Sequence, residues 1–207
     1  ADGMELASAT RTIAGMGVFQ SAASTLFSGV DLTQATHVRM TAATAISATA
    51  IVNEFLVSPS WGAVNGIDAS GTARELSFAH VISGSGGGGN WLTQIGVTPL
   101  KRGGTTVVIT FNSPSFSSTV TRVIAANGSL RESAETMFGF PASEFQDGWV
   151  QVTSVKAVTG FVAYADSTAR GLAIVPAQAA ALTEMLFAHI AQATGWLTGV
   201  ALLNTSS

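Results

Sequence analysis

The chain contains no cysteine, so it can form neither disulfide bonds nor thiolate metal sites. Charged residues are also scarce, at 10% of the sequence, whereas about 25% is usual for a soluble domain. Hydrophobic residues reach 47%, which excludes a disordered chain. Because the net charge is only -3, electrostatic repulsion between copies is weak, and we expect some tendency to self-associate.

Clustered positive charge and long apolar runs are lacking as well. Of the nine Lys and Arg residues, only Lys101 and Arg102 are adjacent, so the chain has no basic stripe with which to displace counterions from a nucleic acid. The longest apolar candidate, residues 171–190, is interrupted by Pro176 and Glu184, whereas a membrane-spanning helix needs roughly 20 apolar residues. We therefore expect neither nucleic-acid binding nor a membrane-spanning segment.

The first residues, Ala1-Asp2-Gly3, include no initiator methionine. Two interpretations remain open: a trimmed chain, or a mature terminus left after removal of a signal peptide. The polar surface implied by the composition, rich in Ser, Thr and Gly rather than in charge, favours secretion. We expect an extracellular or cell-surface protein.

An internal repeat is the strongest signal in the sequence. Four blocks recur in the same order, shifted by 105 to 112 positions. The pairs of blocks are 10–17 with 121–128, 37–41 with 149–153, 78–81 with 187–190, and 91–93 with 196–198. The shift changes where the first copy has a glycine-rich segment, 83–90, and extra loop residues cost little entropy. This pattern predicts a tandem duplication.

Most segments between the turns are typical of strands. Residues 105–111 are rich in β-branched side chains, and residues 119–126 run into Asn127-Gly128, the dipeptide that tight hairpins prefer. Further strands are expected at 149–154, 158–165, 171–175, 185–190 and 197–204, with at most a turn or two of helix near 178–182. We predict an all-β fold of two tandem antiparallel β-sandwich modules, Ig-like or jelly-roll-like, related by internal duplication. The expected boundaries are 1–8 for an N-terminal segment, 9–113 for module one and 118–207 for module two.

The second copy has no counterpart of the strand at 105–111. A sheet that lacks a strand exposes unpaired backbone groups, which natural proteins seldom leave bare. Our hypothesis is that residues 1–8 of a neighbouring subunit fill this edge by strand addition, which would build a filament if the contact does not close. The alternative is that a loop shields the edge. The contact residues expected are Met4, Glu5 and Leu6 on the donor and Leu202, Leu203 and Asn204 on the acceptor.

Side chains that could carry catalysis are scattered. His80 and His189 occupy equivalent places in the two copies, so we interpret them as structural residues rather than ligands of one ion, and His37 as a surface strand residue. The sequence has no G-x-S-x-G elbow, no phosphate-binding loop and no calcium-loop pattern. We therefore expect no catalytic residue, no metal site and no cofactor.

Aromatic residues are the remaining candidates for binding. Trp91 and Trp196 are repeat-equivalent, which indicates packing. Trp61 has no counterpart and follows Pro59 in a loop-rich insert; if exposed, its ring could stack on a sugar or anchor a partner. The alternative is a ring folded back over the sheet. The glycine run 84–89 would lie in the same binding patch.

Several motifs of the second copy resemble a β-sandwich repeat, Ig-like, of large secreted bacterial surface proteins. They are Gly148-Trp149-Val150-x-Val152-Thr153-Ser154, Val158-Thr159-Gly160-Phe161, Gly171-Leu172-Ala173-x-Val175-Pro176, Phe187-Ala188-His189-Ile190 and Gly195-Trp196-Leu197-Thr198. The first copy matches only in outline, because His37 replaces Trp149. The resemblance implies an extracellular sandwich and assigns no activity, since such folds have many roles.

These observations together favour an extracellular structural protein, the subunit of a surface fibre or layer that assembles through β-strand addition between subunits. The alternative is an adhesin or carbohydrate-binding module that recognises a glycan or another surface partner. An enzyme ranks a distant third. In the first case the partner is a second copy of the chain.

Overall fold

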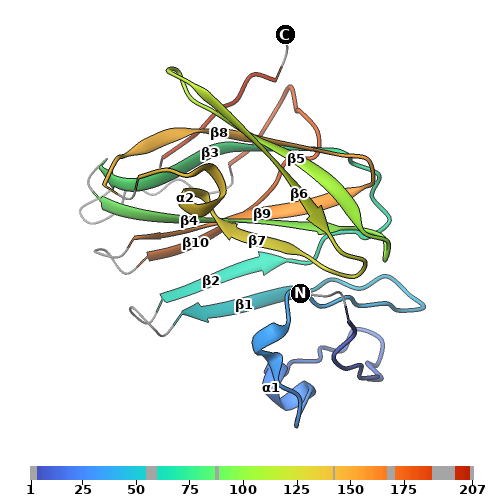
Figure 1. Ribbon diagram of the computed structural model, residues 1–207. Helices are drawn as coiled ribbons and strands as arrows, with labels where there is room; N and C mark the ends of the chain where they lie inside the picture. Colours follow the sequence, from blue (N-terminus) through green and yellow to red (C-terminus); the bar gives the residue numbers. More distant parts are fainter. Residues whose placement is uncertain are drawn as a thin grey trace.

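The structure is a computed structural model that describes residues 4–54, 60–86, 89–141, 143–166, 171–187 and 199–205. Its centre is a β-sandwich-like arrangement of antiparallel strands, which confirms the all-β class (Figure 1). The elements of this sandwich are β3 (Glu75–Gly86), β4 (Gly89–Pro99), β5 (Thr105–Asn112), β6 (Ser117–Ile124), β7 (Leu130–Ser133), α2 (Ala134–Phe138), β8 (Gln146–Ser154), β9 (Val158–Asp166) and β10 (Gly171–Pro176).

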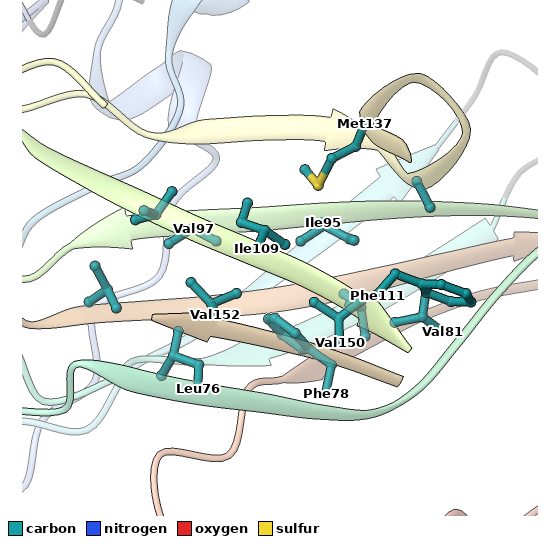
Figure 2. Close-up of a cluster of buried hydrophobic side chains, with 14 of the residues drawn as sticks. Leu76, Phe78, Val81, Ile95, Val97, Ile109, Phe111, Met137, Val150 and Val152 are labelled. Atoms are coloured by element: carbon teal, nitrogen blue, oxygen red, sulfur yellow. The ribbon is translucent and has the colours of Figure 1, made fainter. Parts of the chain in front are cut away.

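Eight strands share one hydrogen-bonded network in the order β10-β9-β4-β3-β8-β5-β6, with β7 on β4. The network folds into two layers because β3 and β4 pair only near their hairpin, at Gly84–Gly86 with Gly89–Trp91. Beyond that point β3 pairs with β8, whereas β4 pairs with β9 and β7. The hydrophobic core fills the space between the layers (Figure 2).

Alternation along the strands explains the core. In β5 the buried residues Val107, Ile109 and Phe111 alternate with outward-facing Thr106 and Val108, as the two-residue period of a strand requires. The same layer receives Val150 and Val152 from β8, and the opposite layer contributes Ile95 and Val97 from β4 and Val162 from β9. The predicted strand at 105–111 is confirmed.

The short helix α2 covers one part of the core. Ser133 accepts a hydrogen bond from the backbone N–H of Thr136 and so caps the helix, and Gly139 ends it with a positive φ of 70°. Met137 is buried, and the ring of Phe140 meets Phe111 edge to face at 4.9 Å. The helix thus covers part of the core and contacts strands of both layers.

A second, two-stranded sheet precedes the sandwich. It consists of β1 (Thr49–Glu54) and β2 (Ser60–Asn65) and lies beside β10 (Figure 1). Close approach is possible because residue 62 is glycine: a Cβ there would lie 3.0 Å from Ile174 Cδ1. Before β1, the described residues 4–48 form only α1 (Ala23–Leu26) and the 3-10 helix η1 (Leu32–Gln34). Between residues 4 and 52 no side chain is buried.

The predicted division into modules 9–113 and 118–207 is wrong. Its boundary falls in the tight connection between β5 and β6, which pair with each other, and β5 also pairs with β8. Strands β3 and β4, assigned to module one, pair with β8 and β9 of the supposed module two. The repeat blocks identify similar segments, but they do not determine which segments pair. The folded unit instead runs from Ala73, whose carbonyl oxygen accepts from Val158 N–H, to Gln178, which exchanges backbone hydrogen bonds with Ser77.

Two further predictions at the C-terminal end are corrected. Residues 185–187 and 199–204, expected as parts of strands, have no regular secondary structure. Residues 178–182, expected to include a turn of helix, form an isolated bridge at Gln178 followed by bends and coil. Along the parts that the structure describes, residues 185–187 and 199–204 have no strand partner.

Candidate interaction surface

The described residues contain no group of three or more His, Asp or Glu side chains that could hold a metal ion. His80 Nε2 lies 3.3 Å from Asp147 Oδ1, but both side chains are substantially exposed, so this pair contributes little to stability. The hydroxyl of Tyr164 donates a hydrogen bond to the backbone oxygen of His80. The backbone of His80 thus makes a structural contact, and the role of its side chain stays a prediction. Its repeat equivalent, His189, lies outside the described residues.

The best-defined ion pair also has a structural position. Arg122 on β6 approaches Glu132 on β7 with two parallel contacts: Nε to Oε2 at 2.9 Å and Nη2 to Oε1 at 2.9 Å. Such a bidentate pair holds guanidinium and carboxylate in a fixed geometry. The pair links β6, an edge strand of one layer, to β7 of the other layer. The guanidinium donors in this pair are therefore not available to a substrate.

The glycine-rich hairpin is packed by its own tryptophan. Trp91 is half-buried, and its indole N–H donates to the carbonyl oxygen of Gly86 at 3.0 Å. A Cβ on Gly89 would lie 2.7 Å from Asp166 Oδ2 and 3.0 Å from the Trp91 ring. The described part of the run 84–89 is thus strand covered by side chains, so Trp91 packs on the hairpin and does not reach the inter-sheet core.

A shallow hollow of about 490 Å³ lies between β2 and β10. Its lining consists of residues 63–67, Ile174 and Pro176, and none of these side chains is an acid, a base or a nucleophile. The backbone of Trp61 lies in β2 next to this hollow, opposite Asn53 in the hairpin. The side chain of Trp61 is outside the described set, so its role as a ligand contact stays a prediction.

Large apolar side chains are exposed mainly on two segments, which we call the amino-terminal flank (residues 4–65) and the carboxyl-terminal flank (residues 177–205). On the amino-terminal flank they are Met4, Leu6, Ile13, Met16, Val18, Phe19, Val38, Met40, Ile46, Ile51 and Val52. On the carboxyl-terminal flank they are Leu182, Met185, Leu186, Phe187, Val200 and Leu202. Soluble monomers rarely concentrate exposed apolar surface in this way. The flanks are therefore the candidate interaction surface.

The predicted contact residues lie on these flanks, but not together. Met4, Glu5 and Leu6 have no regular secondary structure, and Met4 is 69% exposed. Leu202 is 71% exposed, and Leu203 and Asn204 follow it in coil. In Figure 1 the described start of the chain, in dark blue, lies on the side of β1 and β2, and its described end, in dark red, lies on the opposite side of the sandwich. Any contact between the two groups would have to join different copies of the chain.

The amino-terminal flank touches the end of the sandwich at two polar contacts. Arg39 Nη2 donates to the carbonyl oxygen of Leu100 at 2.9 Å, and His37 Nδ1 lies 2.9 Å from Ser129 Oγ. Partial burial lowers the pKa of His37, and the nearby positive charge of Arg39 lowers that pKa further. His37 is thus held neutral at a docking contact, and the prediction that it lies on a strand is wrong.

No helix in the described ranges is both long and apolar enough to cross a lipid bilayer. No protein-family model matches the chain, and no curated protein is similar to it. The crystal structure of Thermotoga maritima 1070 is similar to part of the fold, with 15% identity, a TM-score of 0.43, and coverage of 51% of this chain and 93% of that chain. A likeness at this level carries no argument about function.

Proposed function

We propose that the chain is an extracellular structural protein, a subunit of a surface fibre or layer that assembles through β-strand addition between subunits. One observation supports this most: 17 of the 25 exposed large apolar side chains in the described part of the chain lie on the two flanks, outside the sandwich. Their burial requires a surface that a single sandwich does not provide. Apolar burial is the dominant favourable term in most associations.

The irregular backbone of the amino-terminal flank supports strand addition in particular. Most of this flank before β1 has neither helix nor strand, and backbone outside regular structure can pair with an added strand. The low charge of the chain opposes such contacts only weakly. An extracellular, cell-surface location is part of the proposal and rests on the composition and on the resemblance of residues 148–207 to a secreted repeat.

The internal duplication is also part of the proposal. Similar segments that occur twice give each copy of the chain two related surfaces, and a head-to-tail contact between them builds a filament when its rotation does not close into a ring. Electron microscopy and light scattering of the purified chain test this function. We expect filaments or layers whose size grows with protein concentration. A chain that stays a monodisperse monomer at all concentrations contradicts it.

A second candidate, an adhesin or carbohydrate-binding module, is favoured by the hollow beside β2. A glycan array probed with the intact chain and with Trp61→Ala tests it. Glycan binding by a monomer, lost in Trp61→Ala, would favour recognition over assembly. The comparison of glycan binding is valid only if the intact chain and Trp61→Ala have the same sandwich stability.

A further inference from the structure

The amino-terminal flank repeats local structures of the sandwich at a shift of 111 residues. Met16 has a positive φ of 61°, and the N–H of Gly17 donates to Ala14 O at 2.9 Å. At the equivalent place Asn127 has φ 56°, and Gly128 N–H donates to the Ala125 carbonyl at 3.0 Å. The helix α1 begins at Ala23, and α2 begins at Ala134, again 111 residues later.

The hairpin of the flank repeats a hairpin of the sandwich as well. In β1–β2 the pairs run from Thr49 with Asn65 to Glu54 with Ser60. In β9–β10 the pairs run from Pro176 with Phe161 to Gly171 with Asp166. Shifting β10 by 111 and β9 by 112 residues reproduces the register of β1–β2. A turn, a helix and a hairpin therefore occur in the same order in both places.

The segments that fail to repeat are those whose strand partners are not local. Residues 6–13, 19–22 and 34–42 correspond to β6, β7 and β8, yet they contain no strand. In the sandwich β6 pairs with β5, β7 with β4, and β8 with both β3 and β5. Elements that need only local partners form in the flank, and elements that need β3, β4 or β5 do not.

The exposed apolar residues of the flank match the buried core of the sandwich. Ile13, Val38, Met40 and Ile46 are each between 47% and 58% exposed. Their equivalents Ile124, Val150, Val152 and Val158 are at most 3% exposed. The amino-terminal flank thus carries one side of a hydrophobic core without the other side.

The carboxyl-terminal flank carries the missing side. Met185, Phe187, Val200 and Leu202 are between 45% and 71% exposed, and their equivalents in β3 and β4 are Leu76, Phe78, Ile95 and Val97, at most 3% exposed. Residues 188–198 lie outside the described residues and enter this argument only through the sequence blocks shared with 79–93. By sequence, this flank corresponds to the β3–β4 hairpin.

We infer that the carboxyl-terminal flank of one copy adds to the amino-terminal flank of a second copy and completes another sandwich shared between the two chains. The inference rests on the proposed function and specifies its partner and register. The two flanks lie on opposite sides of the intact sandwich, so completion between copies extends head to tail (Figure 1).

The register of β4 with β9 fixes the pairs expected between copies. Thr98 lies opposite Thr159, and Pro99 opposite Val158. By the repeat, Leu203 of one copy lies opposite Ser47 of the next. Residues 6–13 correspond to β6, which pairs with β5 and not with β3 or β4, so the added hairpin gives them no partner. Strand addition therefore uses residues 34–54 as acceptor rather than Met4–Leu6 as donor.

Engineered cysteines test this register without background, because the chain has none of its own. The double variant Ser47→Cys/Leu203→Cys, oxidised and run on a non-reducing gel, should give a ladder of covalent oligomers. Both positions lie in coil outside the sandwich, so folding is preserved. Thr98→Cys/Thr159→Cys is the matched internal pair and should cross-link within one chain. Ser115→Cys/Leu203→Cys, with Ser115 exposed in the β5–β6 turn, should give no ladder.

The outcomes separate the inference from the function on which it rests. Oligomers of the unmodified chain without a ladder in Ser47→Cys/Leu203→Cys overturn the register and leave the assembly function intact. A cross-linked species the size of one chain overturns completion between copies. An unmodified chain that is monomeric in light scattering overturns the assembly function and this inference together.

Discussion

The hydroxyl of Tyr164 in β9 donates a hydrogen bond to the backbone carbonyl oxygen of His80 in β3. These strands belong to different layers, so one side chain joins the two halves of the sandwich. Burial raises the pKa of Tyr164 to about 12, from an ordinary value near 10. Because Tyr164 is the sole tyrosine of the chain, its ionisation can be followed without interference.

We expect the phenolate absorbance of the folded chain to rise with a midpoint near 12, and that of the unfolded chain to rise near 10. The folded state binds the proton more tightly, so stability is full below pH 10 and declines as the pH rises from about 10 to about 12. A midpoint near 10 in the folded chain would contradict the burial of this ring.

Replacing the same side chain tests the bond itself. Tyr164→Phe removes the donor to His80 and should lower the free energy of unfolding by about 1 kcal/mol, the usual worth of one partly buried hydrogen bond. It should also abolish the loss of stability between pH 10 and pH 12. Denaturant unfolding at neutral and at high pH measures both effects.

Two valines of β5 test which face of this strand packs into the hydrophobic core. Val107 in β5 is fully buried, whereas its neighbour Val108 is 37% exposed on the opposite face. Val107→Ala should cost about 2 kcal/mol of unfolding free energy through lost burial and a cavity. Val108→Ala is the matched control and should change stability by about 0.5 kcal/mol or less. Equal effects in thermal unfolding would show that β5 does not face the core as described.

How much the sequence predicts depends on whether a feature is local. The β-branched run at 105–111 predicts one strand, and Asn127-Gly128 predicts a turn at the end of another. Both strands and the turn form. Pairing is not local, because β8 reaches back to β3 across a large stretch of sequence. Repeat blocks alone therefore placed the domain boundary between β5 and β6, inside a single sheet. The strand at 105–111 occurs only once in the sequence. This single occurrence indicates that the folded unit starts later than the first repeat.

Interaction residues were harder to identify than strands for a related reason. Val38 and Met40 alternate like core residues of a strand, so the sequence alone suggests burial, yet their side chains are exposed. Only the partner strands decide between these states. The hollow near Trp61 had no sequence signal, since it is formed by β2 lying against β10.

The amino-terminal flank should control assembly without affecting the stability of the sandwich. Val38→Asp/Met40→Asp places charge on the surface that we expect to be buried between copies, and should raise the concentration needed for assembly by about tenfold or more. Light scattering across a dilution series measures this. Val123→Asp, at an exposed position on β6, is the control and should assemble normally. Both proteins should unfold at the temperature of the unmodified chain.

The docking of residues 36–39 should respond to acid. Because the pKa of His37 is lowered in the folded state, the docked flank prefers the neutral ring: docking is complete above about pH 6.5 and weakens as the pH falls through the lowered pKa. Proteolytic cleavage near residue 40 should accelerate in that range. His37→Gln, which cannot titrate, should cleave at a rate independent of pH over the same range.

Amide hydrogen exchange on assembled and dilute chain measures completion of the amino-terminal flank most directly. We expect assembly to protect the amides of residues 34–42 and 46–48, while residues 6–13, whose sandwich equivalent β6 pairs with neither β3 nor β4, exchange as fast as before. Assembled chains in which residues 34–48 exchange as fast as in the dilute chain would contradict the account.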